Sequence, residues 1–184
     1  MRIRTIAAAI AVVVVAAVIV VITRHMVTDP PGHDHAGGDS HAHIDPLDPT
    51  GATPDTVAIN ALTIAYTWRP GTDASTWEAL HRAAALLTDP LARAAAARPD
   101  PAPKALQEWS SWVDSRDQVS AAAAPLAPAT VDGDTASVLV RVTQTVLHAG
   151  GASTPYSSQV MQVELKQLGE TWLMARYNVR GDLR

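Results

Sequence analysis

The sequence predicts an α+β domain, with helices packed on a curved antiparallel sheet, behind an N-terminal transmembrane helix. Three observations lead to this fold class. Residues 6–22 consist only of alanine, valine and isoleucine. Large apolar side chains recur at helical spacing over residues 56–114, whereas residues 118–179 alternate apolar and polar side chains between turn residues. Helices that come first and strands that come later are typical of an α+β domain.

Charge and cysteine content exclude several classes of function. The chain has 184 residues, a formal net charge of -4 and a sequence pI near 5.9. An acidic chain is unlike nucleic-acid-binding domains, which are normally basic, so no nucleic-acid partner is expected. The chain has no cysteine, which rules out disulfides and thiolate chemistry. Composition divides the chain into residues 1–24, 25–55 and 56–184.

Residues 1–24 are predicted to be a short cytoplasmic tip and a transmembrane helix. The apolar run and its flanks can cross the roughly 30 Å hydrocarbon core of a bilayer. The alternative is a cleaved signal peptide, but the run exceeds the usual apolar region of about 7–15 residues and no small-x-small cleavage site follows it. Arg2 and Arg4 keep the N-terminus in the cytoplasm by the positive-inside rule. We therefore expect a single-pass cell-membrane protein with an extracytoplasmic C-terminal domain.

Residues 25–55 are predicted to be a flexible linker, because proline, glycine and aspartate dominate and few apolar side chains are present. Two His-x-His pairs stand out: His33 with His35, and His41 with His43. Imidazole suits zinc, copper and nickel, so these four residues are candidate metal ligands. The simpler interpretation is a solvated spacer, because nothing in the sequence orients the rings. Calorimetry on a 25–55 peptide that shows no binding tighter than a scrambled control would exclude the metal site.

The first half of the domain is predicted to be helical. The expected helices run over residues 56–67, 77–87, 90–98 and 104–114. Asp55 or Thr56 can cap the first helix. Ser75–Glu78 is a capping box for the second. Asp89 can cap the third, with Pro90 at the first helical position.

The second half is predicted to be an antiparallel meander. The expected strands run over residues 118–126, 135–147, 156–168 and 171–179. The first is a poor strand by propensity, because it is rich in alanine. In the last, Leu173, Ala175, Tyr177 and Val179 alternate with Trp172, Met174 and Arg176. Such period-two patterns indicate a sheet with one buried face.

The order of an anchor, a polar spacer, helices and a long meander resembles the nuclear-transport-factor-two-like, or cystatin-like, cone fold. Two membrane-anchored families share this plan: the inner-membrane component of type IV secretion and conjugation channels, and the mammalian-cell-entry (Mce)-associated membrane proteins. Residues Ala61–Trp68 and Trp77–Leu91 look more like the conjugation type, and Gly169–Val179 suits both. The chain lacks long coiled-coil heptads before the domain, which also favours the first family. Both resemblances imply scaffolding inside an envelope complex.

We therefore expect a non-catalytic accessory or scaffold protein with no cofactor. Its partners would be the membrane, other envelope proteins and a second copy of the chain, contacted through a sheet face or exposed edge. The first alternative is a metal-binding envelope protein that acts through the linker. The second is a ligand-binding or enzymatic cone domain, in which Tyr66, His81 and Asp89 could line the cavity. Helix-surface and capping roles are the simpler interpretation of these three residues.

The five tryptophans are expected to fill the core, because so many of their neighbours are alanine. Trp109 and Trp112 are three residues apart, so one of them is expected to be exposed and available to a partner.

Overall fold

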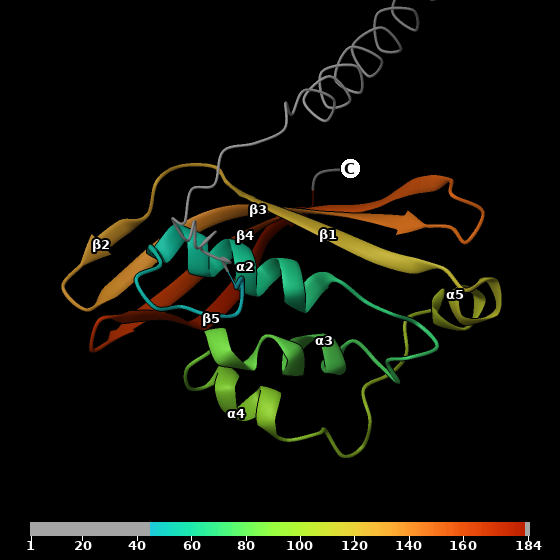
Figure 1. Ribbon diagram of the computed structural model, residues 1–184, viewed down its shortest axis with the longest axis horizontal. Helices are drawn as coiled ribbons and strands as arrows, with labels where there is room; N and C mark the ends of the chain where they lie inside the picture. Colours follow the sequence, from blue (N-terminus) through green and yellow to red (C-terminus); the bar gives the residue numbers. More distant parts are fainter. Residues whose placement is uncertain (1–44, 183–184) are drawn as a thin grey trace, which may run out of the picture. The chain divides into compact units, whose positions relative to one another are not determined.

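The computed structural model describes residues 45–182. These residues fold into one antiparallel sheet with helices packed on its inner side (Figure 1). The helices are α2 (Pro54–Tyr66), α3 (Trp77–Arg82), α4 (Leu91–Ala96) and α5 (Trp109–Ser115), with a 3-10 turn at Ala84–Leu86. The strands are β1 (Gln118–Pro125), β2 (Thr130–Asp132), β3 (Thr135–Leu147), β4 (Ser153–Leu168) and β5 (Thr171–Asp182). The predicted α+β class with a curved antiparallel sheet is confirmed.

The predicted transmembrane segment, residues 1–24, lies outside the described residues. Within residues 45–182, no helix combines the length and the apolar character that a membrane crossing requires.

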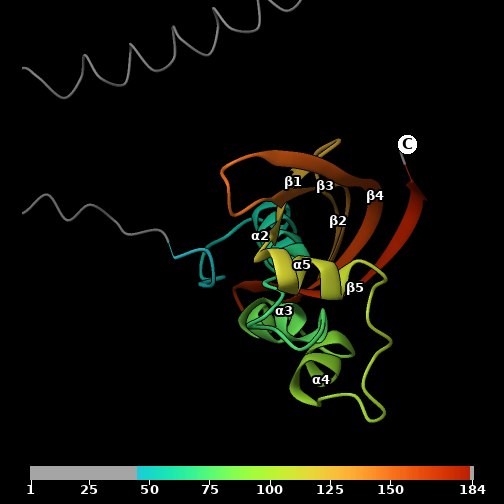
Figure 2. The same cartoon turned by 90° about the vertical axis from the view of Figure 1, so that its right-hand side faces the viewer.

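The sheet has the order β1-β3-β4-β5, and the short β2 pairs with the beginning of β3. β1 and β2 are therefore successive partners of the same long strand. All pairs are antiparallel, with Val140 opposite Pro125 on one side and Met161 on the other. The long strands curve around α2, so the sheet has a concave side filled by helix and a convex side (Figure 2). Right-handed strand twist and bulges produce this curvature.

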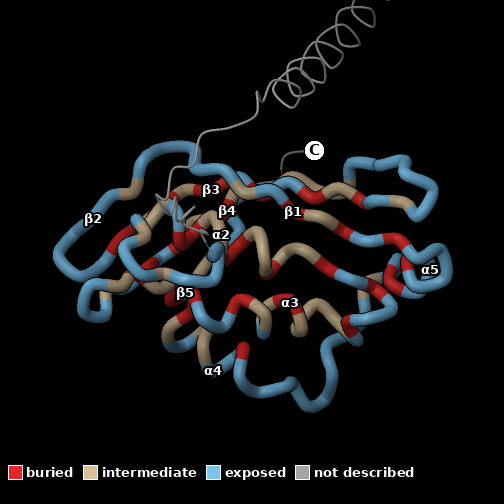
Figure 3. Tube along the Cα trace, in the orientation of Figure 1, coloured by how far each residue is buried: buried red, intermediate tan, exposed pale blue. Residues whose placement is uncertain are grey.

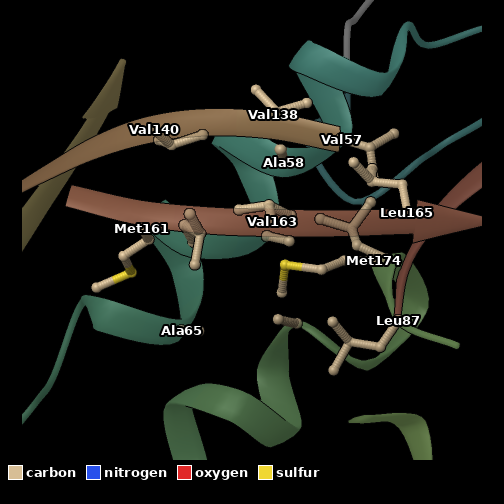
Figure 4. Close-up of a cluster of buried hydrophobic side chains, with 14 of the residues drawn as sticks. Val57, Ala58, Ala65, Leu87, Val138, Val140, Met161, Val163, Leu165 and Met174 are labelled. Carbon is tan, nitrogen blue, oxygen red and sulfur yellow. The ribbon is translucent and has the colours of Figure 1, made fainter. Parts of the chain in front are cut away.

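Helix α2 occupies the concave side because its inner face is small and apolar. It buries Val57, Ala58, Ala61, Leu62 and Ala65. Alanines let the helix approach the sheet closely, because interaxial distance depends on the side chains at the contact. Opposite them lie buried side chains from β3, β4 and β5, among them Val138, Val140, Met161, Val163, Leu165 and Met174 (Figures 3 and 4).

Helix α2 begins earlier than predicted. Its N-cap is Thr53, whose side chain accepts a hydrogen bond from the Thr56 amide at 3.3 Å, and not Asp55 or Thr56. Pro54 takes the first helical position, where its missing N–H costs nothing. Residues 45–53, which the sequence places in the linker, contact the domain: Asn60 donates a hydrogen bond to the Pro46 carbonyl at 3.1 Å.

The capping box that precedes α3 is present in modified form. The Glu78 carboxylate accepts from the Ser75 amide at 2.8 Å, as predicted. The Ser75 hydroxyl accepts from the Trp77 amide and not from the Glu78 amide, and it donates to the Glu78 carboxylate at 2.8 Å. α3 ends at Arg82, and its expected continuation is a 3-10 turn.

The remaining two helices are shorter than predicted. α4 spans only Leu91–Ala96, and Asp89 does not cap it but pairs with Arg93 at 3.1 Å. α5 begins at Trp109, five residues after the expected start at Lys104. Residues 97–108 form a loop in which Pro99, Pro101 and Pro103 prevent helix propagation.

The four predicted strands form, but β2 is an unpredicted strand, β4 begins three residues early at Ser153, and the alternation in β5 differs. β1 forms despite its alanines, and Val138, Val140 and Val142 of β3 are buried as one face. In β5, Met174 pairs with Leu165 but Arg176 pairs with Glu164, so Ala175 is an extra residue in a β-bulge. Met174 and Ala175 are consequently both buried, and the predicted strict alternation through Val179 is wrong.

Candidate functional site

The candidate metal ligands His33, His35, His41 and His43 lie outside the described residues. Within residues 45–182, no group of three or more His, Cys, Asp or Glu side chains is placed to hold a metal ion.

Tyr66, His81 and Asp89, which could have lined a cone cavity together, do not share a site. The His81 ring is bonded through Nδ1 to the Ala95 carbonyl at 2.9 Å. Asp89 is exposed and paired with Arg93. Tyr66, at the last turn of α2, lines a cavity between the helices and the sheet, and Asp89 lines a different cavity with residues of β3, β4 and β5. A structural role therefore accounts for His81, while Tyr66 and Asp89 line separate cavities.

Six aromatic rings gather at one end of the concave side. They are Tyr66, Trp68, Trp109, Trp112, Tyr156 and Tyr177. The Trp68 ring is central, with its centroid 6.3–6.5 Å from four of the other five. Tyr156 meets Trp112 edge to face at 5.1 Å. These separations are the ones that aromatic pairs favour. We call these six residues the aromatic cluster.

The prediction that Trp109 or Trp112 is exposed is wrong. Their exposed fractions are 7% and 6%, because both rings of α5 pack on Trp68. The expectation that the tryptophans fill the core holds for four of the five. Trp77 is half-buried, stacked on His81 and covered by the Arg98 guanidinium.

Local backbone structure explains why the cluster forms. α2 ends at Tyr66, and Trp68 then pairs with Val119 of β1 through two backbone hydrogen bonds of 2.8 and 3.0 Å. On the opposite side, Gln144 pairs with Ser157 and Thr145 with Pro155, which leaves Tyr156 as the extra residue of a bulge in β4. The bulge turns the Tyr156 ring toward Trp68 and Trp112.

A cavity of about 680 Å³ lies against this cluster. Its walls include Tyr66 and Trp68 from the end of α2, Leu106 from the proline-containing loop, and Gln144 and Gln159 from the sheet. A neighbouring cavity of about 240 Å³ also borders Tyr66 and Trp68. Neither cavity has a charged side chain among its lining residues. We call the larger one the aromatic cavity.

Gln144 organises the floor of the aromatic cavity. It is 3% exposed, its Nε2 donates to the Tyr66 carbonyl at 2.8 Å, and its Oε1 accepts from the Ser157 hydroxyl at 2.7 Å. These two bonds tie α2, β3 and β4 together at the cavity. A side-chain amide has two N–H donors and two acceptor sites, so one donor and one acceptor site of Gln144 are not used by these bonds.

The tyrosine hydroxyls of the cavity remain protonated at physiological pH. Burial, and secondarily the neighbouring Tyr177, raises the pKa of Tyr66 far above its usual range. Burial, and secondarily Glu108, also raises the pKa of Tyr156. Both hydroxyls are therefore hydrogen-bonding groups and not anions, and the arrangement favours binding over proton abstraction.

Another cavity, of about 420 Å³, lies toward the opposite ends of β3 and β4. Charges of both signs line it, including Asp132, Glu164, Lys166 and Arg176. Glu164 and Arg176 already face each other at 3.7 Å, so part of the charge is neutralised within the wall.

A polar group that the sequence analysis missed joins α5 to the β3–β4 hairpin. His148 Nδ1 lies 2.9 Å from Asp117 Oδ2, and His148 Nε2 lies 2.8 Å from the Thr154 hydroxyl. The order carboxylate, imidazole, hydroxyl is that of a hydrolase triad. None of the three residues lines the aromatic cavity, and Asp117 holds the hairpin to the end of α5. We therefore interpret the group as a structural clasp.

The clasp predicts a pH dependence of stability. Burial alone would raise the pKa of Asp117, but hydrogen bonds from Ser115 and His148 hold it below its ordinary value of 3.8. A carboxylate with a lowered folded-state pKa stabilises the fold above the unfolded-state pKa, and this stabilisation is lost as the pH falls through the folded-state value. The difference in denaturation midpoint between wild type and Asp117→Asn should thus be large near pH 7 and shrink near pH 3. The exposed Asp100→Asn is the control; an equal pH profile for both variants would contradict the clasp.

No protein-family model, curated protein or solved structure matches the chain.

Proposed function

We propose that this protein is a non-catalytic, single-pass accessory protein of an envelope complex, of the type IV secretion and conjugation kind or the Mce lipid-transport kind. The apolar run Ile6–Ile22 and the arginines before it support a membrane anchor with a cytoplasmic N-terminus. The main support for the proposal is that helices cover only one face of the sheet. All described helices lie on the concave side of the sheet, and the convex side carries none of them (Figures 1 and 2).

The convex face carries apolar and polar side chains side by side. Leu139 and Val160 are half-buried there, on the side opposite Val140 and Met161. Arg141, which pairs with Val160, is exposed. Non-obligate interfaces combine scattered apolar groups with polar ones, and arginine is enriched in them.

The β1 edge is less suited to a partner than the convex face. Trp68 already pairs with Val119, and the Thr67 hydroxyl accepts from the Ala121 amide at 3.1 Å. Pro125, at the end of the strand, has no N–H to offer. Covered backbone groups and a terminal proline are devices that prevent edge pairing.

Site-specific photo-crosslinking in intact cells tests the proposal. A photoreactive residue in place of Arg141, on the convex face, should form adducts that mass spectrometry identifies as envelope proteins. The matched position is Arg93, which is also exposed but lies on α4. Adducts at neither position would contradict the accessory role, and adducts at Arg93 alone would contradict the choice of face. A C-terminal reporter enzyme active only in the cytoplasm would contradict the orientation.

The alternative function, metal binding by the linker, rests on the two His-x-His pairs. Deletion of residues 29–43 separates it from the accessory role and spares residues 45–53, which contact α2. Assembly should survive a shorter spacer, whereas metal handling should not. Loss of both would indicate that spacer length itself matters to the complex.

A further inference from the structure

We propose that the aromatic cavity is a binding site for an uncharged saccharide. This inference goes beyond the accessory role and does not depend on it, because the cavity lies on the concave side of the sheet and the proposed protein contact on the convex side. Three properties of the cavity lead to it: its size, the chemistry of its lining, and the way its polar groups are held.

The cavity has the size of a small-molecule site. Its volume of about 680 Å³ falls within the roughly 300–1,000 Å³ of typical ligand pockets. Buried aromatic rings back it, so a ligand meets a wall that is already packed. The lining residues come from the end of α2 and the residues after it, the 97–108 loop and two strands.

The lining offers hydroxyl and amide groups around aromatic rings. Five lining residues on the concave side carry a hydroxyl or a side-chain amide, namely Tyr66, Gln144, Tyr156, Ser157 and Gln159, and no lining residue is charged. A saccharide ring has hydroxyls at its edge, which both donate and accept, as Ser, Tyr and Gln side chains do. Its faces carry C–H groups, which can pack on Tyr and Trp rings. The two surfaces are therefore complementary.

Ligands of other chemistry fit less well. An ionised ligand would lose its water without meeting a counter-charge, which costs several kcal/mol. An acyl chain would cover hydroxyl and amide groups without pairing them, which costs roughly 1–3 kcal/mol for each buried group. The absence of charged lining residues and the abundance of hydroxyls thus both favour a neutral, hydroxyl-rich ligand.

The polar groups are held in place before a ligand arrives. Gln144 is fixed by its bonds to the Tyr66 carbonyl and the Ser157 hydroxyl, with hydrogen-bonding capacity left over. Tyr156 is fixed by its packing on Trp68 and Trp112. A preorganised wall lowers the entropy cost of binding. Gln159 pairs with the buried Val142, so it belongs to the concave side. It is the more exposed of the two amide side chains that line the cavity.

The experiment is a titration of the full chain in lipid nanodiscs, since detergents with sugar headgroups would compete. The probes are cellotriose, maltotriose, mannotriose and chitotriose, followed by tryptophan emission because Trp68 lines the cavity. We expect saturable binding of at least one neutral trisaccharide. The uronic-acid counterpart of that trisaccharide should bind at least about tenfold more weakly, because its charge would be unpaired in the cavity.

Two substitutions on one strand localise the site. Gln159→Leu removes a lining amide and should weaken binding about tenfold, the effect of one lost hydrogen bond of about 1.4 kcal/mol. Gln167→Leu is the matched control, because Gln167 lies on β4 but outside the cavity. Tyr156→Phe, which keeps the packed ring and loses only the hydroxyl, is a second variant should Gln159→Leu alter the near-UV circular dichroism.

Three results would overturn the proposal. The first is the lack of a saturable response to every neutral trisaccharide, also by equilibrium dialysis. The second is an equal loss of affinity in Gln159→Leu and Gln167→Leu, or unchanged affinity in both Gln159→Leu and Tyr156→Phe. The third is tighter binding of the uronic acid or of a fatty acid than of any neutral saccharide. None of these measurements involves envelope partners. A negative result would therefore contradict the saccharide site without contradicting the accessory role, which the crosslinking experiment tests separately.

Discussion

Replacement of Leu62 by alanine should lower the free energy of unfolding by about 3 kcal/mol, one of the two largest effects we expect. Leu62 is 0% exposed and lies on the face of α2 that packs against the sheet. The substitution removes buried apolar surface and leaves a cavity, and Leu→Ala changes at such sites cost about 2–5 kcal/mol. Its neighbours on that helix face, Ala58, Ala61 and Ala65, are too small to fill the space. Denaturant unfolding followed by tryptophan emission measures the change.

Leu168→Ala is the matched control for this substitution. Leu168 is 54% exposed at the end of β4, so the same change should cost less than about 0.5 kcal/mol. The midpoint should shift for Leu62→Ala with little change in the denaturant slope, because the surface exposed on unfolding is nearly the same. Equal costs at the two positions would show that α2 is not the centre of the core.

Strand β3 could be predicted from sequence because one of its faces is buried along its whole length. Val138, Val140 and Val142 are read correctly for this reason: an antiparallel sheet with one covered face imposes alternation on its residues. Strand β1 is a weaker prediction, since alanine has little strand propensity. Pairing with β3 on one side and with Trp68 on the other forms the strand despite its composition.

The errors arise where tertiary contacts override local pattern. Ala175 is the extra residue of the β5 bulge, and no residue type there marks a bulge in the sequence. The spacing of Leu106, Trp109 and Val113 suggests one helix from Lys104. Leu106 instead lines the aromatic cavity, and the helix begins only at Trp109.

The candidate site could be predicted only in part. The sequence marks Tyr66 as a possible lining residue but groups it with His81, which lines no described cavity, and with Asp89, which lines a different one. Gln144 and Tyr156 carry no motif, and their place in the cavity depends on a register shift between β3 and β4. Helical and strand periodicities determine which face a residue occupies, but not which residues of distant elements meet.

Replacement of Arg82 by methionine should lower the free energy of unfolding by about 2–3 kcal/mol. Arg82 contacts both carboxylate oxygens of Asp73, at 2.6 and 3.0 Å, and donates to the Thr67 carbonyl at 2.8 Å. Asp73 is 6% exposed, so methionine would leave a buried charge without its partner. Breaking a buried pair in this way costs about 3–5 kcal/mol, and the partial exposure of Arg82 reduces the figure. Thermal unfolding of the full chain measures the loss.

The matched control is Arg93→Met. Arg93 pairs with Asp89, but their side chains are 77% and 59% exposed, and exposed pairs contribute less than about 1 kcal/mol. Arg82 also holds the residue before Trp68, so Arg82→Met should weaken saccharide binding in the aromatic cavity, whereas Arg93→Met should not. Adding Asp73→Asn to Arg82→Met should recover part of the stability, because the uncompensated charge is removed. A loss no larger than that of Arg93→Met would show that Asp73 is satisfied by other groups, such as the Arg69 amide at 2.9 Å.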